Sequence, residues 1–206
     1  MSFRSRMTVL AASSLLLAGC AVPGQAAAPG VAATFQDVTL TTADLDTLAQ
    51  EWSDASGGQV QPSRDALATF AALGPDAVVA AEESAAEAGS DLVLNDALVR
   101  QVAENWFSGL GVTDVEVSDG VIDSMRDMLA IYLVAGADAT LADITALSDG
   151  VAADATFSPR LGSYSTDALL ASLDTALAAA QGGASYTAFI EVTGFGAPDV
   201  PWAARG

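Results

Sequence analysis

The chain has 206 residues, a length that suits one domain or one domain with an appendage. It carries 26 acidic side chains against 7 basic ones, all of them arginines, and its formal net charge is −19. So acidic a surface argues against binding to the phosphate backbone of nucleic acids, which needs basic residues, and it repels an anionic membrane surface.

The composition also limits the chemistry that the chain can perform. It contains no histidine, which excludes the Ser-His-Asp and Cys-His catalytic arrangements and removes the commonest zinc ligand. Its only cysteine is Cys20. An enzyme would have to work with carboxylates, hydroxyls and arginine. We therefore expect a protein that is not an enzyme and that uses no metal or cofactor.

The first 20 residues have the organisation of an export signal. Arg4 and Arg6 precede an apolar run from Met7 to Ala18, and small residues follow. Leu17-Ala18-Gly19-Cys20 resembles the lipobox of bacterial lipoproteins, which implies a signal peptide over residues 1–19, cleavage before Cys20 and diacylglycerol on the Cys20 sulfur. An uncleaved membrane helix would need roughly 20 apolar residues, and this run has only about a dozen, so it is too short to span a bilayer. A plain signal peptide that leaves a free cysteine is the alternative.

The next segment is expected to be a tether followed by a hairpin and a helix. Residues 20–33 are rich in alanine, glycine and proline and carry no charge, which is typical of a flexible linker with a reach of roughly 20 Å. A small hairpin is predicted at residues 34–40, with Gln36-Asp37 at its turn. Thr41-Thr42-Ala43-Asp44 has the form of a capping box. Apolar residues at helical spacing then predict a helix from about Thr42 to Ser53.

The middle of the chain is expected to be a series of helices. Ser63 is a candidate N-cap for the first of them. Gly74-Pro75 is expected to stop or kink that helix, with a second segment from Asp76 to Ala88. Apolar periodicity predicts further helices around residues 94–110, 119–136, 141–150 and 169–182.

Two extended segments are expected in the last third of the chain. The first is Ala152 to Phe157. The second is a strand through residues 186–192, where apolar and more polar residues alternate. Pro201-Trp202 either packs onto the domain or lies in a mobile tail. The fold class is therefore mainly α, with a helical domain over residues 34–165, closed by a few short strands, and a helix-and-strand extension over residues 166–206.

Two groups of residues are candidates for a site. The aromatic residues at helical spacing mostly suit a core, but Trp52, Trp106 and Phe107 are candidate peptide-binding residues, since one of them exposed beside methionines would form an adaptable apolar groove. A second group is acidic and would suit a carboxylate hydrolase if two acids stood roughly 5–10 Å apart across a cleft. It consists of Asp114, Glu116, Asp119 and Asp123. The simpler interpretation is a polar loop and a helix cap, and glutamates 82, 83 and 87 are expected to form a solvated helix face.

In order, these pieces resemble the SurA-like N-terminal domain of chaperone-type lipoproteins from actinobacteria. The resemblance covers about residues 33–164 and the C-terminus. It starts with the hairpin and capped helix of residues 35–46 and continues to residues 155–164, where Ser158-Pro159-Arg160-Leu161-Gly162 is similar to the family's Asn-Pro-Arg-Tyr-Gly. It implies that the N-terminal strand pairs with this later strand. Ser158 and Leu161 depart from the family pattern, as does Gly74-Pro75 within a helix expected to be continuous.

The resemblance also implies a function. Members of the family are thought to bind unfolded or newly exported chains, and larger relatives carry a parvulin-type prolyl isomerase domain. About 40 residues follow Tyr164, too few for that domain. We expect a lipoprotein anchored on the extracytoplasmic face of the cell membrane that holds unfolded polypeptides without enzymatic activity. An adaptor lipoprotein of one cell-envelope complex is the alternative.

Overall fold

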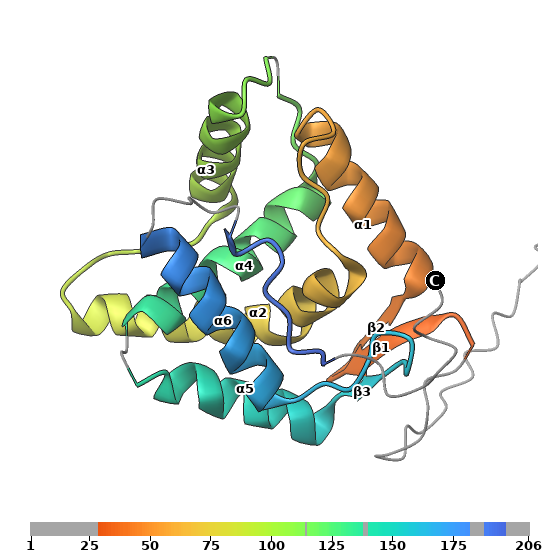
Figure 1. The fold of residues 1–206 in the computed structure, drawn as a ribbon. Helices are drawn as coiled ribbons and strands as arrows, with labels where there is room; N and C mark the ends of the chain where they lie inside the picture. Colours follow the sequence, from red (N-terminus) through yellow and green to blue (C-terminus); the bar gives the residue numbers. More distant parts are fainter. Residues whose placement is uncertain (1–28, 114, 138–139, 182–187, 197–206) are drawn as a thin grey trace, which may run out of the picture.

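The computed structural model describes residues 29–113, 115–137, 140–181 and 188–196 (Figure 1). Within these ranges the chain is mainly helical with a small antiparallel sheet, as the sequence predicts. The signal peptide, Cys20, most of the predicted tether, Asp114 and Pro201-Trp202 lie outside the described residues. The elements, in order, are β1 (Val31–Phe35), β2 (Val38–Thr41), α1 (Thr42–Ala55), α2 (Arg64–Glu87), α3 (Asp96–Gly109), α4 (Asp119–Ala137), α5 (Ala142–Asp154), β3 (Thr156–Phe157) and α6 (Thr166–Gln181).

The sheet has the order β2-β1-β3, and β1 pairs antiparallel with both neighbours. The predicted hairpin is present: Gln36 and Asp37 form the turn, and Gln36 takes a left-handed conformation with φ of 47°. Ala33 and Thr34 pair with Phe157 and Thr156, so the N-terminal strand does meet the later one. The sheet lies at one end of the molecule and α3 at the opposite end (Figure 1).

Strand β1 begins earlier than the sequence indicates. The predicted tether extends to residue 33, but β1 starts at Val31, and Ala32 and Ala33 are buried. Small alanine side chains lack the alternation that marks a strand. They are buried here because the central strand of the sheet packs directly on the helices.

Local capping signals place the first two helix starts correctly. The Thr41 hydroxyl accepts a hydrogen bond from the Asp44 amide at 3.1 Å, and the Asp44 carboxylate accepts one from the Thr41 amide at 2.8 Å. These bonds complete the capping box of α1 and hold the pKa of Asp44 below its usual value. Ser63 caps α2 in the same way, through the Ala66 amide. These hydrogen bonds satisfy backbone N–H groups that have no partner within the helix at its first turn.

Helix α2 runs without interruption through Gly74-Pro75, so the predicted stop is wrong. Pro75 has no N–H group, so the helical hydrogen bond to the carbonyl of Ala71 is missing. Buried residues on both sides of it, Leu73 and Ala77, continue one apolar face, and α2 packs more extensively against α4 than against any other described element. The burial of this long face outweighs the lost hydrogen bond.

Three predictions for the C-terminal half need correction. Helix α5 continues past Gly150 to Asp154, so the extended segment shrinks to the two residues of β3. Residues 188–192 form a turn, not the predicted strand, with the Val192 amide donating to the Phe189 carbonyl. An alternating strand would expose residue 189, whereas the Phe189 side chain is 1% exposed. The predicted strand residue Tyr186 lies outside the described residues.

One apolar core joins the helices, β1 and the segment 188–196. Within the described residues, α6 and this segment contribute fully buried side chains to the same core as α1 to α5, so they are not a separate appendage. In Figure 1 the segment, in dark blue, runs beside α6 and across α4 and α2 towards the sheet. The packing of α6 and the segment completes the domain.

Candidate functional site

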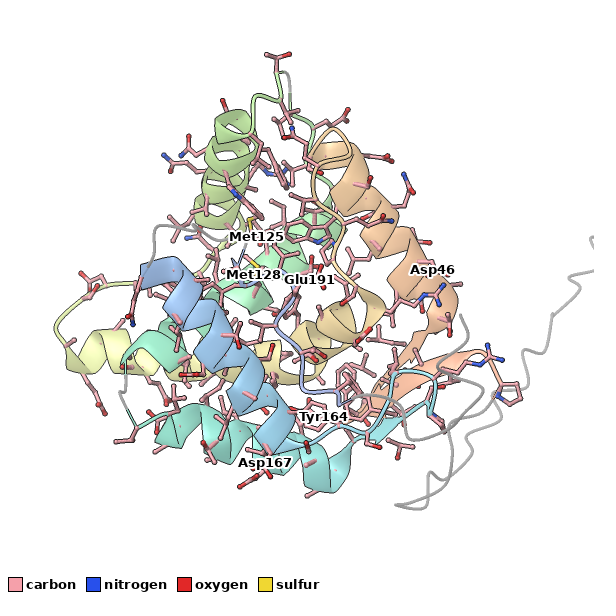
Figure 2. All side chains as sticks on the ribbon, viewed as in Figure 1. Asp46, Met125, Met128, Tyr164, Asp167 and Glu191 are labelled. Carbon is pink, nitrogen blue, oxygen red and sulfur yellow. The ribbon has the colours of Figure 1, made fainter. Side chains whose placement is uncertain are left out.

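The three aromatic residues predicted to bind peptides lie in the core. Trp52 is 0%, Trp106 8% and Phe107 0% exposed, and their ring centroids are 5.3–5.9 Å apart. The expectation that one of them lies exposed beside methionines is wrong, because α1, α3 and α4 converge on this cluster. Met125 and Met128 on α4 are also buried (Figure 2). These rings therefore provide packing energy and no surface in this conformation.

The Trp52 indole has a specific polar partner inside this cluster. Its Nε1 donates to the Ser124 hydroxyl at 2.7 Å, and that hydroxyl donates in turn to the carbonyls of Gly120 and Val121. A buried indole N–H normally needs such an acceptor. The bond ties α1 to α4 at the centre of the domain.

The described acidic residues of the 114–123 region do not form one cluster, because their ion pairs are with different arginines. Asp119 pairs with Arg100 at 3.2 Å and Asp123 pairs with Arg126 at 2.8 Å, while Glu116 is exposed. Ser118 caps α4 through the Val121 amide. The described residues contain no cluster of three or more acids or cysteines with the geometry of a metal site.

Glutamates 82, 83 and 87 lie in different environments. Glu82 accepts a hydrogen bond from the Leu94 amide at 2.8 Å and so fixes the approach to α3. Glu83 and Glu87 are exposed, as expected of a solvated face.

Part of the acidic region borders a cleft that the sequence does not reveal. The cleft has a volume of about 520 Å³ and lies between the C-terminal half of α1 and the loop before α4. Three carboxylates line it, those of Glu51, Asp54 and Glu116, together with valines from residues 112–117 and no basic side chain. Glu51 accepts a hydrogen bond from Ser118 at 2.7 Å. The lining would suit a ligand that is cationic and partly apolar.

The polar contact described for Glu51 is with a serine hydroxyl, and the cleft is open to water. Glu51 and Asp54 lie three residues apart on α1, a spacing that is common on solvated helix faces and gives no functional signal. Sequence reasoning had no means of linking them to Glu116.

Among the described carboxylates, Asp127 has the pKa that its environment changes most. It is half-buried against Gly74 of α2, where a Cβ atom on residue 74 would lie 2.1 Å from the Asp127 Cγ. Burial raises the pKa of Asp127 to about 7, while the neighbouring Arg126 lowers it and Asp123 raises it further. The charged form is therefore held in an unfavourable environment at neutral pH.

The most extensive feature that the sequence did not predict is the packing of residues 188–196 into the core. These residues are here called the C-terminal segment. Its buried side chains are Phe189, Ile190, Val192 and Phe195, each at most 6% exposed. The amide of Gly194 donates to the buried Thr69 hydroxyl of α2 at 3.0 Å, and the amide of Thr193 donates to Ser172 of α6 at 3.1 Å. In Figure 2, Glu191 lies part-way along the segment, and Tyr164 lies beside its C-terminal part, where it pairs with Phe195.

Comparison with known proteins adds no assignment. No protein-family model matches this chain, and no curated protein or solved structure is significantly similar to it.

The described helices also offer no route through a bilayer. None of them combines the length and the apolar character that a membrane span requires.

Proposed function

We propose that this protein is an exported lipoprotein, held on the extracytoplasmic face of the cell membrane by diacylglycerol on Cys20, whose helical domain holds unfolded or newly secreted polypeptides without enzymatic activity. The observation that carries the anchor is the N-terminal sequence: Arg4 and Arg6, the apolar run from Met7 to Ala18, and the cysteine that follows Leu17-Ala18-Gly19. Ten residues separate Cys20 from Val31, where β1 begins.

Two observations support the chaperone-like part of the proposal. The pairing of β1 with β3 is the arrangement implied by the resemblance to SurA-like N-terminal domains. The domain also offers an acidic, partly apolar cleft, and complementary charge favours basic polypeptide segments there. The strongly negative charge of the chain would keep an anchored domain soluble and away from an anionic membrane surface.

The anchor is tested by replacing the lipidated residue. Cys20→Ala should release the protein from membranes or leave it unprocessed at the precursor size, and it should abolish incorporation of a labelled fatty acid. Ser13→Ala, in the same apolar run, is the matched control and should be processed normally. Membrane attachment of Cys20→Ala at the mature size would contradict the proposal.

The holding activity is tested with the lipid-free mature chain. At micromolar concentration it should suppress aggregation of a reduced exported model protein, as measured by light scattering, and it should bind unfolded peptides. Serum albumin at equal concentration is the control for non-specific protection. Failure of both assays would overturn the chaperone-like function and leave the anchor untouched.

One observation favours a second candidate, an adaptor lipoprotein for one envelope complex. In the described residues the large exposed apolar side chains are Val38, Val79 and Val93, on three different parts of the chain. Scattered single residues do not form the apolar patch that general binding of unfolded chains uses. Crosslinking in intact cells separates the candidates: an adaptor yields one stoichiometric partner, and a chaperone-like protein yields many clients.

A further inference from the structure

The C-terminal segment is seated in the domain much as a bound peptide would be. Its nine residues contain a turn at residues 188–191 and a single bridge, and they belong to no helix or strand of their own. The segment crosses α4, α2 and α6, and contacts to each of them are made by Phe189, Gly194 and Thr193 respectively. Elements far apart in the sequence thus form a common surface that one short segment covers (Figure 1).

Buried apolar side chains of the segment make most of its contacts with the domain. The Phe189 ring packs edge-on against Tyr132 of α4, with centroids 4.6 Å apart. Phe195 meets Phe157 and Tyr164 at 4.9 and 5.4 Å. Glu191, between the buried positions, is exposed. Each insertion needs an apolar side chain of suitable size at the right spacing, and it does not need this particular chain.

The hydrogen bonds to the segment are made by its backbone. Thr69 and Ser172 accept from the amides of Gly194 and Thr193, as described above. The chain before α6 adds a short ladder, in which the Ser165 amide donates to the Gly194 carbonyl at 2.8 Å and the Gly196 amide donates to the Ser163 carbonyl at 3.0 Å. Backbone groups are common to all polypeptides, so a strand-like ladder of this kind gives affinity with little dependence on sequence.

One position does impose a sequence requirement. A Cβ atom on residue 194 would lie 2.2 Å from the Tyr164 ring, so only glycine fits there. The Tyr164 ring cannot easily withdraw, because it stacks on Phe157 and its hydroxyl bonds Ser148 at 3.1 Å. An occupant of this surface therefore carries apolar residues on both sides of a glycine.

We propose that residues 188–196 occupy, within the same molecule, the site at which the domain binds an apolar, glycine-containing stretch of another polypeptide. This inference rests on the proposed holding function and gives it a location and a control. Binding of a client requires release of the C-terminal segment, so the apparent affinity is lowered by the small fraction of molecules in which the segment is out. The buried surface is also kept from non-specific association while no client is present.

The test uses the mature chain with Cys20→Ala and a fluorescein-labelled peptide of residues 188–196 as the probe. Phe189→Ala weakens the seat of the segment and leaves the receiving surface intact, so it should bind the peptide about tenfold or more tightly than the parent chain. Glu191→Gln, at the exposed position, should bind like the parent. A probe with valine in place of Gly194 should not bind, because the valine side chain would clash with the Tyr164 ring. Fluorescence anisotropy measures all four.

A reversible lock provides the second variant. Ser172→Cys with Thr193→Cys introduces two thiols on neighbouring residues, since the Ser172 hydroxyl accepts from the Thr193 amide at 3.1 Å, and no other thiol remains in this chain. Loss of both free thiols on oxidation, measured by thiol titration, shows that the lock has closed. The oxidised form should not bind the probe, and reduction should restore binding. If circular dichroism shows that Phe189→Ala does not fold, the test uses the double-cysteine lock and the milder variant Val192→Ala instead. Equal probe binding by the oxidised and reduced lock, or by folded Phe189→Ala and Glu191→Gln, would overturn the inference.

The same proteins separate this inference from the proposed function. Aggregation of a reduced exported protein is followed with the oxidised and the reduced lock. Suppression by the reduced form alone supports both statements. Equal suppression by both forms overturns the site and leaves the holding function standing. Probe binding that responds to the lock, without suppression by either form, supports the site and overturns the holding function.

Discussion

At the scale of single residues, two polar side chains of α4, Ser124 and Asp127, have opposite effects on stability at neutral pH. Ser124 is the acceptor for the Trp52 indole, and Asp127 packs against Gly74 of α2. The consequences of changing them differ, because one is satisfied by a partner and the other is held against its preferred charge state.

Ser124→Ala should be destabilising out of proportion to the single oxygen lost. The Trp52 N–H would remain buried at 0% exposure without its acceptor, which costs about 1–3 kcal/mol. Urea unfolding at pH 7 measures the loss. Ser108→Ala, on the exposed part of α3, is the control and should change the unfolding free energy by less than about 0.5 kcal/mol. A Ser124→Ala protein as stable as the control would contradict this role.

Asp127 predicts a specific dependence of stability on pH. Its pKa of about 7 in the folded protein lies above the value of 3.8 in the unfolded chain, so the folded state binds the proton more tightly. The contribution of Asp127 to stability is therefore lost as pH rises from about 4 to 7.

Asp127→Asn removes this charge and keeps the shape of the side chain. It should unfold with nearly the free energy of the parent at pH 4 and be more stable at pH 8, on the order of 2 kcal/mol, since the side chain keeps some contact with water. Paired urea titrations at the two pH values measure the difference. Asp174→Asn, on the exposed side of α6, is the control for loss of one negative charge and should change the unfolding free energy by less than about 0.5 kcal/mol. A gain that is equal at pH 4 and pH 8 would rule out titration of Asp127 as its cause.

At the scale of the elements, the contact of α2 with α4 organises the domain. Gly74 lets the two helices approach, and the exposed Pro75 is tolerated because the apolar face continues on both sides of it. Arginine pairs add a second layer: Arg64 of α2 bonds Asp46 of α1, and Arg126 of α4 bonds Asp96 of α3 at 2.5 Å. The Arg64–Asp46 pair is exposed and adds little free energy, whereas the Arg126 side chain is only 20% exposed.

Two glycine substitutions should therefore act in opposite directions. Gly74→Ala drives a Cβ atom into Asp127 and should cost about 1–3 kcal/mol, although alanine favours a helix. Gly150→Ala meets nothing within 4 Å in α5 and should stabilise by about 0.5–1 kcal/mol. Thermal unfolding of both variants measures the contrast. A stabilising Gly74→Ala would mean that α2 and α4 separate easily at this point.

At the scale of the whole molecule, charge is the dominant property. With 26 acidic residues against 7 arginines, the folded chain repels itself at neutral pH. Raising NaCl from about 0.02 to 0.5 M shortens the Debye length from roughly 20 to 4 Å. This screening should raise the melting temperature at pH 7.5. Near the isoelectric point of about 4.1 the same salt should have little effect, and an equal response at both pH values would show that self-repulsion is not the cause.

Signals carried by neighbouring residues were enough to predict much of the fold. The hairpin at Gln36-Asp37, the capping box of Thr41 and Asp44, the Ser63 cap and the amphipathic α4 depend on hydrogen bonds and periodicities within a few residues, and the mainly helical class follows from them. The lipobox-like residues around Cys20 are equally local. They predict an anchor without reference to any fold.

Tertiary packing decided what those signals could not. A continuous α2 depends on the apolar face that α4 covers, because its burial outweighs the hydrogen bond lost at Pro75. The aromatic cluster is buried because three helices meet there, and helical spacing alone cannot tell a shared core from an exposed stripe. Residues 188–196 have strand-like composition but no adjacent strand, so their backbone pairs with side-chain hydroxyls and the chain before α6. Their environment consists of residues distant in the sequence, and only the folded chain brings these together.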